Sequence, residues 1–405
     1  MRIIIVNQPV YNRGDESAHR ALIRTLLERI PGVSIEVLYT SSIQKPMEQF
    51  RVSSPQVYYN CVKNFKGATK IMIMGLNNHV LWLFHPTIWT IIRRYKAADL
   101  ILCAPGGICM GGFMNREHMF YLHLAKFLHK PLAYYGRSIG PFLEGTEEQK
   151  KFKLLSLNIM NYFSFFSIRD TKSELLAKSL GFAPVSTVDT AFLETPSESI
   201  PDEINKEIGN TPYMVFVPHM LLWHFAYKNR VSIETMTLFY SKIISVLLSY
   251  NDNIKIVMLP QTYGHCDRYS NDVNFFRDLA SLANNSRIIV IDDKYSSDIQ
   301  QSIIKKSEFV VGARYHSIVF AINNEVPFIS LSYEHKMSGL LETLNKKNSM
   351  IDIEHSMDNE QNVELFIKDF EYKLHHLAFD ISLTTKAKQI ANSCMDAFVK
   401  YCNTL

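Results

Sequence analysis

Short apolar runs alternate with segments of helical periodicity along the first half of the chain. Apolar residues recur at helical spacing first at Ala18, Leu22, Leu26 and Ile30. The apolar runs predict buried strands at Ile3–Val6, Ile35–Tyr39, Lys70–Met74, Leu100–Ala104, Pro131–Tyr135 and Phe163–Ile168. Short strands alternating with helices are typical of a parallel sheet that helices cover on both faces.

A second alternating set follows residues 194–212, which are rich in Pro, Ser, Glu and Asn and predict a linker. Its predicted strands are Tyr213–Val217, Ile254–Leu259, Ile288–Ile291, Phe309–Val311 and Phe328–Ser332. Its predicted helices are Ser232–Ser249, Asn271–Ala283, Asp298–Lys306, His316–Asn323 and Met337–Leu344. The fold expected is α/β, with two doubly wound, Rossmann-like domains facing a cleft. Their bounds are residues 1–195 and 210–360, and a helical tail covers 361–405.

Composition excludes a disordered chain, because 47% of the 405 residues are apolar and only 20% are charged. Lys and Arg number 43 against 39 Asp and Glu, which gives a net charge of +4. We expect this mild, evenly spread charge to favour an anionic small substrate or an anionic membrane, and no nucleic-acid partner. None of the six cysteines forms a Cys-x-x-Cys pair, so reduced thiols in a cytoplasmic protein are expected.

No apolar stretch approaches the 18 or more residues of a membrane span. The nearest one, Val80–Ile92, is broken by His85 and Pro86 and leads into a basic cluster that ends at Lys96. Two interpretations of Val80–Lys96 stay open. It is either a buried helix with a charged end or a peripheral contact with the inner face of a membrane.

Glycines and polar residues follow the predicted strands of the first half, where the carboxyl ends of parallel strands commonly bind ligands. Asn12 and Asp15 belong to the turn after the first strand. Two roles for Asp15 stay open: it caps the next helix, or it joins the free amides of this turn in a site for an anion or hydroxyl group. Gly106 and Gly107 would let a ligand approach the backbone. Their spacing matches neither a dinucleotide fingerprint nor a P-loop.

Two arginines follow the next two predicted strands. Arg137 either faces the cleft or lies on the surface, which is the commoner place for a single arginine. Arg169 stands at a strand-to-helix junction, where its two-pronged donor suits a carboxylate or phosphate. The alternative for Arg169 is an ion pair with Asp170 or Asp189.

The most informative stretch of the second half is Gly312–Ser317, where a strand ends and a helix begins. Arg314 and His316 lie there near a helix N-terminus that favours anions. His316 is placed to exchange a proton beside a bound anion, and the alternative is a capping histidine. After the last strand, Lys336 offers a second cation for a phosphate, or simply begins a solvated helix.

Other polar residues follow the strands of the second half. His219, His265, Asp267 and Glu334 are expected to line the cleft. The run His265, Cys266 and Asp267 could suggest a metal, but ligand-type residues at irregular spacing are weak evidence, and no structural metal is expected.

In this order the motifs resemble those of the polysaccharide pyruvyl transferase family, from about residue 3 to about residue 345. The matching residues are Asn12, Gly14, Asp15, Gly106, Gly107, Ser138–Pro141, Ile168–Asp170, Ser173, Leu176, Gly181, Asp189–Phe192, Arg314, His316, Tyr333, Glu334 and Lys336. The sequence departs from the family pattern at two points. Only two glycines follow Pro105 where members often have three, and Arg137 stands where Gln is frequent.

The resemblance implies a glycosyltransferase-B-like fold, with the acceptor on domain 1–195 and phosphoenolpyruvate on domain 210–360. Family members move a pyruvyl group from phosphoenolpyruvate to a sugar of a capsule or exopolysaccharide, usually as a cyclic ketal, and release phosphate. By this resemblance Arg169, Arg314 and Lys336 would hold phosphoenolpyruvate, and His316 would be the catalytic acid and base. Phosphoenolpyruvate is then a co-substrate, and no other cofactor is implied. Whether the acceptor sugar is free, nucleotide-linked or lipid-linked stays open.

Two other functions stay open. A nucleotide-sugar glycosyltransferase of the same architecture would also use Arg and Lys side chains, on a diphosphate. A non-catalytic partner in polysaccharide assembly would need none of these side chains. The joint presence of Arg169, Arg314, His316 and Lys336 argues against that second alternative.

Overall fold

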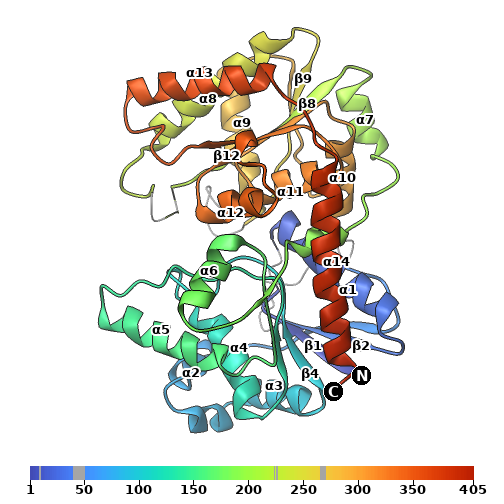
Figure 1. Ribbon diagram of the computed structural model, residues 1–405, viewed down its shortest axis with the longest axis vertical. Helices are drawn as coiled ribbons and strands as arrows, with labels where there is room; N and C mark the ends of the chain where they lie inside the picture. The colour runs from blue at the N-terminus through green and yellow to red at the C-terminus, as the bar shows by residue number, and fades with distance from the viewer. Residues whose placement is uncertain (9–10, 40–50, 223, 225–226, 265–270) are drawn as a thin grey trace. The chain divides into compact units, whose positions relative to one another are not determined.

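The computed structural model describes residues 1–8, 11–39, 51–222, 224, 227–264 and 271–405. The chain divides into two compact units (Figure 1). Unit 1 comprises Met1–Val10, Ser17–Glu194 and Lys388–Leu405, and unit 2 comprises Tyr11–Glu16 and Thr195–Ala387. Each unit contains one parallel sheet with helices, which confirms the predicted fold of two Rossmann-like domains.

Unit 1 is built on a seven-stranded parallel sheet of order β3-β2-β1-β4-β5-β6-β7. Its strands are β1 (Arg2–Val6), β2 (Ser34–Tyr39), β3 (Val57–Cys61), β4 (Leu100–Cys103), β5 (Leu132–Tyr134), β6 (Phe165–Ile168) and β7 (Val185–Ser186). Along β1, Ile3 and Ile5 enter one hydrophobic core, while Ile4 and Val6 enter the other. Because both faces of this strand are buried, its sequence is a continuous apolar run.

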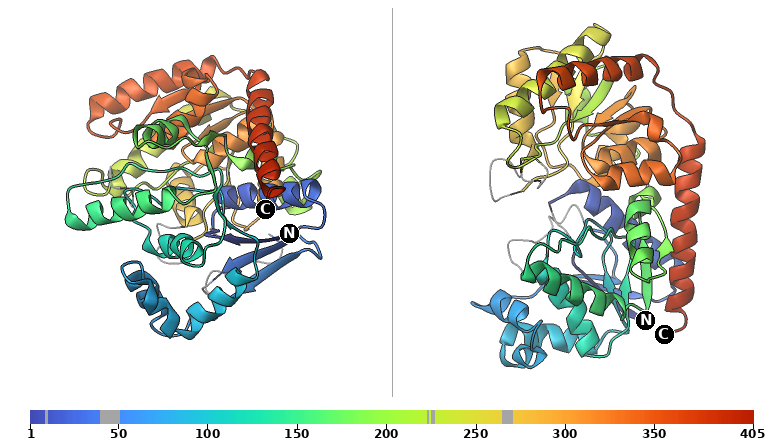
Figure 2. Two further views of the ribbon diagram at one scale, coloured as in Figure 1. Left: turned by 60° about the horizontal axis from the view of Figure 1, so that its bottom comes forward. Right: turned by 60° about the vertical axis from the view of Figure 1, so that its left-hand side comes forward.

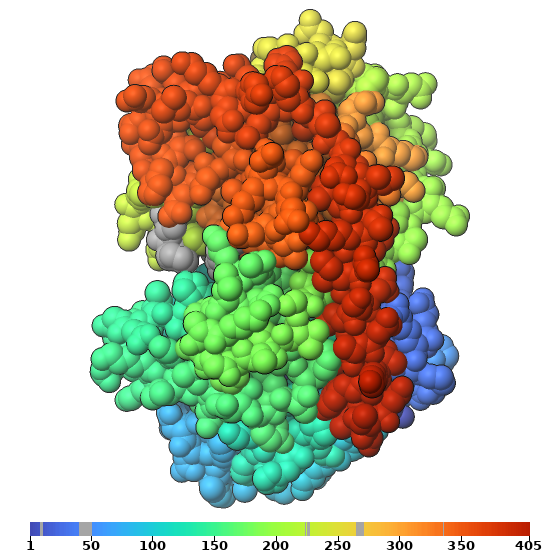
Figure 3. Space-filling model, in the orientation of Figure 1, coloured from blue at the N-terminus to red at the C-terminus, as the bar shows by residue number. Residues whose placement is uncertain are grey.

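Helices cover both faces of the unit 1 sheet. They are α1 (Arg13–Arg29) from Ser17 on, α2 (Ala68–Met74), α3 (Pro86–Lys96), α4 (Arg116–Phe127), α5 (Glu147–Met160), α6 (Thr171–Ser179) and the part of α14 (Ser382–Cys402) from Lys388 on. The 3-10 helices η3 (His79–Phe84) and η4 (Thr190–Leu193) belong to this unit as well. Leu22 and Leu26 of α1 share one core with Met395 and Phe398 of α14. In Figure 3 the part of α14 from Lys388 on lies over one side of unit 1.

The predicted strand Lys70–Met74 is wrong, because these residues belong to the helix α2. The helix begins after Gly67, whose positive φ of 86° suits glycine. Its buried residues, Ala68 and Met72, are four positions apart and so lie on one helical face. The third strand of the sheet is instead β3, an edge strand with only Val57 buried, so it lacks the apolar run that marks the others. Figure 2 shows α2, η3 and α3, in blue to light blue, at the margin of unit 1.

Unit 2 contains a six-stranded parallel sheet of order β10-β9-β8-β11-β12-β13. Its strands are β8 (Tyr213–Val217), β9 (Lys255–Met258), β10 (Ile288–Val290), β11 (Val310–Gly312), β12 (Phe328–Ser332) and β13 (Met350–Asp352). Its helices are α7 (Asp202–Ile208), α8 (Ile233–Tyr250), α9 (Asp272–Ala283), α10 (Ser297–Lys305), α11 (Tyr315–Asn323), α12 (His335–Thr343), α13 (Glu360–His375) and the 3-10 helix η6 (Lys347–Ser349). The five strands expected in this half all form.

Two segments are more structured or more divided than the sequence pattern indicates. The stretch 194–212 contains the short helix α7, which buries Ile204 and Ile208. The segment 361–405 is not one tail, because α13 belongs to unit 2 and α14 from Lys388 on belongs to unit 1. In the described part of the chain, no helix combines the length and apolar character needed to cross a bilayer.

Candidate functional site

Three neighbouring strands of unit 2 end at one edge of the sheet, and candidate residues follow each of them. β8 pairs with β11 and β11 pairs with β12, with Val217 opposite Gly312. His219 follows β8, and Arg314 follows β11. The strand order reverses between β8 and β11. This edge is therefore a topological switch point, where doubly wound sheets bind ligands.

The turn at Tyr11–Glu16 belongs to the same unit as this sheet edge. Tyr11 accepts a hydrogen bond from the amide of Tyr263 at 2.9 Å, and Arg13 donates its amide to Gln261 at 2.8 Å. The carboxylate of Glu16 accepts from the amide of Ser297 at 3.0 Å. These bonds join the start of α1 to the loops after β9 and β10.

Asn12, not Asp15, caps α1, so the capping alternative for Asp15 is wrong. The Asn12 Oδ1 atom accepts hydrogen bonds from the amides of Gly14 at 2.8 Å and Asp15 at 3.2 Å. An amide oxygen at this position satisfies donors that a helix start leaves unpaired. Gly14 lies inside the first turn, where the imidazole of His316 occupies the space that a side chain would need.

Arg314 is held by a buried carboxylate. Asp272, the first residue of α9, is 2% exposed and forms an ion pair with Nη2 of Arg314. The same carboxylate accepts hydrogen bonds from the amides of Gln261 at 3.0 Å and Thr262 at 2.9 Å. Because Asp272 is fixed by the backbone, it fixes the guanidinium after β11 in one orientation.

Lys336 is held at the end of β12 by Glu334, with 2.6 Å between its Nζ and Oε1. His224 Nε2 lies 3.3 Å from the other carboxylate oxygen. Burial raises the pKa of Glu334, but Lys336 and the hydrogen bond from His224 outweigh it, and the pKa falls to about 2. The ammonium also lies 5.9 Å from the ring of Tyr315 and 5.7 Å from that of Tyr333.

His219 supplies a neutral imidazole next to the two cations. Burial, followed by the charges of Arg314 and Lys336, lowers the pKa of His219 well below its ordinary value. Its ring packs edge-on against Tyr333, with 5.0 Å between the ring centroids. Lys336 and His219 both lie against the ring of Tyr333, and Arg314 follows the strand next to that of His219, so the three groups lie at one edge of the sheet.

His316 lies in the first turn of α11 and is 5% exposed. Its ring contacts that of Tyr315 in a T-shaped arrangement at 5.0 Å and that of Phe320 at 6.2 Å. Arg314 is the N-cap residue of the same helix. The start of α11 thus combines a guanidinium, an imidazole and the partial positive charge of a helix N-terminus, a set suited to an anion.

Arg169 lies in unit 1 and is 1% exposed. Its guanidinium forms an ion pair with the buried Asp189. Nε donates to Ser138 Oγ at 3.3 Å, and that hydroxyl donates to Asp170 at 2.7 Å. The structure thus contains the ion pair that the sequence left as an alternative. A role for Arg169 in binding phosphoenolpyruvate stays a prediction.

Arg137 is buried in unit 1, with 2% exposure, rather than exposed on the surface. Nη1 donates to the carbonyl groups of Ala104 at 2.9 Å and Asn7 at 3.2 Å, and Nε donates to that of Gly107 at 2.7 Å. Gly106 and Arg137 also pair as a parallel bridge. The guanidinium therefore ties together the chain after β1, β4 and β5.

The structure gathers only part of the predicted site in one unit. Unit 2 holds Asn12, Asp15, His219, Arg314, His316, Glu334 and Lys336, and unit 1 holds Gly106, Gly107, Arg137 and Arg169. His265 and Asp267 lie outside the described residues. Asp272 was missed, because an acidic residue at a helix start normally reads as a cap. Among the residues that the structure describes, no three His, Cys, Asp or Glu side chains group as metal ligands would.

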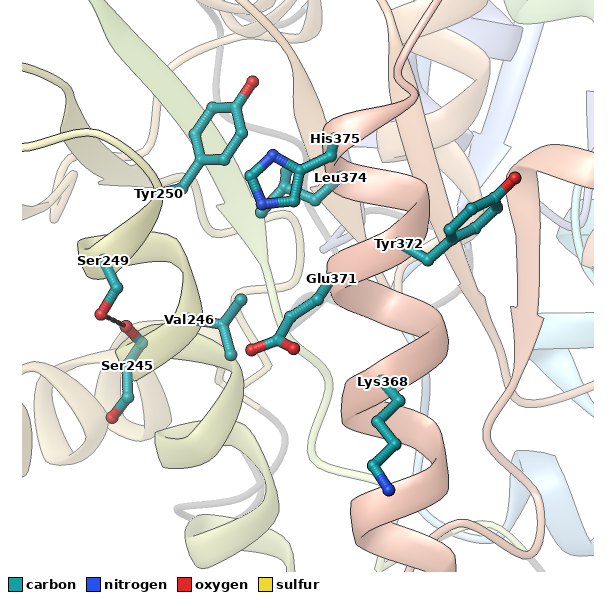
Figure 4. A pocket seen from close by; sticks show the side chains of 9 residues that line it. All are labelled: Ser245, Val246, Ser249, Tyr250, Lys368, Glu371, Tyr372, Leu374 and His375. Atoms are coloured by element: carbon teal, nitrogen blue, oxygen red, sulfur yellow. Dashed lines mark hydrogen bonds between the residues drawn. The ribbon is translucent and has the colours of Figure 1, made fainter.

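A surface pocket of about 580 Å³ lies elsewhere in unit 2, between α8 and α13 (Figure 4). It is lined by Ser245, Val246, Ser249, Tyr250, Lys368, Glu371, Tyr372, Leu374 and His375. None of these side chains belongs to the sheet edge described above. Its polar side chains come from exposed helix faces, so it does not compete with that edge as the functional site.

Solved structures with the same architecture define the fold class. A UDP-GlcNAc 2-epimerase from Neisseria meningitidis bound to UDP-GlcNAc has a TM-score of 0.60 at 11% identity, covering 100% of both chains. A ugt transferase from Siraitia grosvenorii in complex with UDP has a TM-score of 0.59 at 10% identity, covering 98% of this chain and 99% of that one. At such identities the likeness shows the fold alone, which is glycosyltransferase-B-like.

The family model for polysaccharide pyruvyl transferase matches residues 12–335, so the chain belongs to that family. The resemblance seen in the motifs is thereby confirmed. The amylovoran biosynthesis protein AmsJ of Erwinia amylovora is 21% identical over 281 residues. That match covers 65% of this chain and 64% of AmsJ, just under two thirds of its length.

Proposed function

We propose that the protein transfers the pyruvyl group of phosphoenolpyruvate to a sugar of a surface polysaccharide or its precursor, forming a cyclic ketal and releasing phosphate. One observation carries the proposal. In a member of this family, Arg314, His316 and Lys336 follow adjacent strands at the switch point of one sheet.

The charges at this sheet edge match those of phosphoenolpyruvate, which carries a phosphate and a carboxylate. Arg314 offers a fixed guanidinium fork, and Lys336 offers a compact ammonium. The N-terminus of α11 adds backbone donors beside them. Asp272 and Glu334 each neutralise part of this charge, so a bound anion would share the cations with them.

His316 is the proposed acid and base. In its protonated form it gives a proton to the methylene carbon of phosphoenolpyruvate, which leaves an oxocarbenium-like centre at the neighbouring carbon. A sugar hydroxyl attacks that carbon, the bond to the phosphate oxygen breaks, and a second hydroxyl closes the ketal. The two hydroxyl protons balance the new methyl hydrogen and the proton on the released phosphate.

The cations lower the barrier by stabilising charge on the departing phosphate. Arg314 and Lys336 perform this role without a change of position, because Asp272 and Glu334 already orient them. His219 stays neutral, so it adds no competing charge and offers hydrogen bonds to a sugar hydroxyl.

The experiment incubates the protein with phosphoenolpyruvate and a panel of free, nucleotide-linked and lipid-linked sugars. We expect phosphate release together with the mass gain of one pyruvate ketal on a sugar. His316→Ala should lose most turnover, about 100-fold or more, while the protein stays folded.

Two results contradict the proposal. The first is full turnover in His316→Ala. The second is transfer of a sugar from a nucleotide sugar without any use of phosphoenolpyruvate, which would establish the glycosyltransferase alternative. Thermal stabilisation by phosphoenolpyruvate, compared with stabilisation by a nucleotide sugar, distinguishes the two donors even if no acceptor in the panel reacts.

A further inference from the structure

Positive charge is concentrated in one stretch of unit 1. Between Glu48 and Asp99 the sequence contains seven Lys and Arg residues and no Asp or Glu. Since the whole chain carries only +4, the remainder is net negative. The prediction of evenly spread charge is therefore wrong for this stretch.

Large apolar side chains are exposed in the same stretch. Phe84 is 77% exposed, Trp89 is 47% exposed, and Phe65, Val80 and Leu83 are exposed as well. Together with Lys63, Lys66 and Arg93 we call them the basic aromatic patch. In Figure 2 the segment that carries them lies at the margin of unit 1.

Hydrogen bonds join the separate segments of the basic aromatic patch. Trp89 Nε1 donates to the carbonyl of Leu83 at 2.6 Å, which connects α3 to η3. The amide of Phe65 donates to Thr87 Oγ1 at 3.0 Å, which brings the chain before α2 to the start of α3. A shallow pocket opens among Leu83, Phe84, His85, Pro86, Trp89, Thr90 and Arg93. The patch is therefore one surface.

Cations flank the exposed aromatic rings. The guanidinium of Arg93 lies 6.0 Å from the centre of the Trp89 ring, and the ammonium of Lys63 lies 5.2 Å from that of Phe65. Lys66 is exposed beside them, and its carbonyl lies 3.4 Å from His85 Nε2. Arg94, by contrast, forms an ion pair with Glu36 of β2 and is not part of the patch.

The opposite side of the same elements is firmly anchored. Ile88, Ile91, Ile92 and Tyr95 of α3 and Trp82 of η3 are buried in the core of unit 1. One side of this segment is thus buried in the core, as the first interpretation of the sequence expects, while its other side is exposed. The core does not need the exposed aromatic side chains, so packing of the domain does not account for them.

We propose that the basic aromatic patch binds the surface of an anionic phospholipid bilayer without crossing it. Aromatic and aliphatic side chains insert at the boundary of headgroups and acyl chains, and basic side chains contact anionic headgroups. Lys and Arg tolerate this position because their stems lie along apolar surface while their charges stay in water. The centre of a protein–protein interface is normally depleted of lysine, so the lysines of the patch favour a lipid surface over a protein partner. The proposal is independent of the transferred group, and it would bring the enzyme to lipid-linked sugars.

The test is flotation of the full-length protein with vesicles. One set contains phosphatidylcholine and phosphatidylglycerol, and the other contains phosphatidylcholine alone. We expect binding to the anionic set only, and weaker binding at high salt. A Phe84→Ser, Trp89→Ser variant should bind about tenfold less or weaker, and Lys63→Glu, Lys66→Glu should lose the preference for anionic lipid.

The matched control is Leu154→Ser, Leu238→Ser, which removes equally exposed apolar side chains from α5 and α8. It should bind vesicles as the unchanged protein does, and melting curves should show that both Ser variants are folded at the temperature of the flotation assay. The proposal is overturned if the unchanged protein does not float with anionic vesicles, or floats equally with neutral ones. It is also overturned if Phe84→Ser, Trp89→Ser reduces self-association or oligonucleotide binding and leaves vesicle binding unchanged.

Discussion

Gly14 and His316 lie so close together that a side chain at position 14 has no room. A Cβ atom on Gly14 would lie 1.8 Å from Cγ of His316 and 2.0 Å from its Nδ1. Such contacts require one of the two groups to move. Gly14 is in the first turn of α1, so this contact, rather than an unusual backbone angle, is what requires glycine.

Gly14→Ala should therefore displace the His316 ring. We expect a cost of about 1–3 kcal/mol in unfolding free energy and a loss of turnover on the order of 100-fold, because a shift of an ångström misaligns a proton donor. Thermal melting and steady-state kinetics measure the two effects. Gly145→Ala is the control, because its Cβ would meet only Gln149 at 3.4 Å. Unchanged turnover in Gly14→Ala would show that the position of His316 does not matter for the reaction.

Asp272 is predicted to position Arg314 rather than to touch the substrate. In Asp272→Asn the backbone bonds from Gln261 and Thr262 can persist, but the charge that holds the guanidinium is lost. We expect the KM for phosphoenolpyruvate to rise about tenfold with a smaller change in kcat, since the cation is retained but misdirected.

The comparison for Asp272 is Asp278→Asn, on the exposed side of the same helix α9. It removes an identical charge from the same element and should leave the KM unchanged. A general loss of stability in Asp272→Asn would lower the concentration of active enzyme, and with it the apparent kcat, but would leave the KM unchanged. A KM that rises more than kcat falls therefore tests the positioning role. Equal KM values for the two variants would count against it.

Much of unit 2 could be predicted from sequence because its strands are continuous apolar runs with both faces buried. Arg314, His316 and Lys336 follow such runs, and parallel strands of a doubly wound sheet end at one edge. Their proximity thus follows from the strand pattern. The pairing of Arg314 with Asp272 does not, since no local pattern shows that the loop after β9 returns to β11.

The contacts of the arginines in unit 1 could not be predicted from the sequence either. A run of apolar residues predicts a buried strand, but it does not show which charged groups meet inside a domain. Arg137 and Arg169 follow strands just as Arg314 does, but both are fully buried, whereas Arg314 is partly exposed. Whether an arginine after a strand meets carbonyl groups, a carboxylate or solvent depends on tertiary packing.

Removing Arg169 alone should destabilise unit 1 strongly, because Asp189 would be left as a buried charge without its partner. We expect Arg169→Ala to cost about 3–5 kcal/mol, measured by chemical denaturation. Arg169→Met, Asp189→Leu should recover much of that loss by replacing the pair with apolar side chains.

The double variant also separates structure from binding. If Arg169 serves only the fold, the recovered protein should transfer pyruvate at close to the original rate. If Arg169 holds phosphoenolpyruvate, as the family resemblance implies, the variant should be stable yet show a raised KM for that substrate. A double variant that is no more stable than Arg169→Ala would contradict the ion-pair account.

Glu334 should make the stability of unit 2 depend on pH. Its pKa lies at about 2, below the ordinary 4.5, so the folded state favours the ionised carboxylate. The stabilisation is therefore fully present above pH 4.5 and is lost as the pH falls towards 2.

Glu334→Gln should lower the unfolding free energy by about 3 kcal/mol at pH 7 and by much less near pH 2–3. Glu342→Gln in α12, which breaks the exposed pair with Lys347 of η6, should cost under about 1 kcal/mol at either pH. Chemical denaturation at both pH values measures the difference, and an equal loss in Glu334→Gln at pH 7 and pH 3 would show that the carboxylate is not the stabilising form.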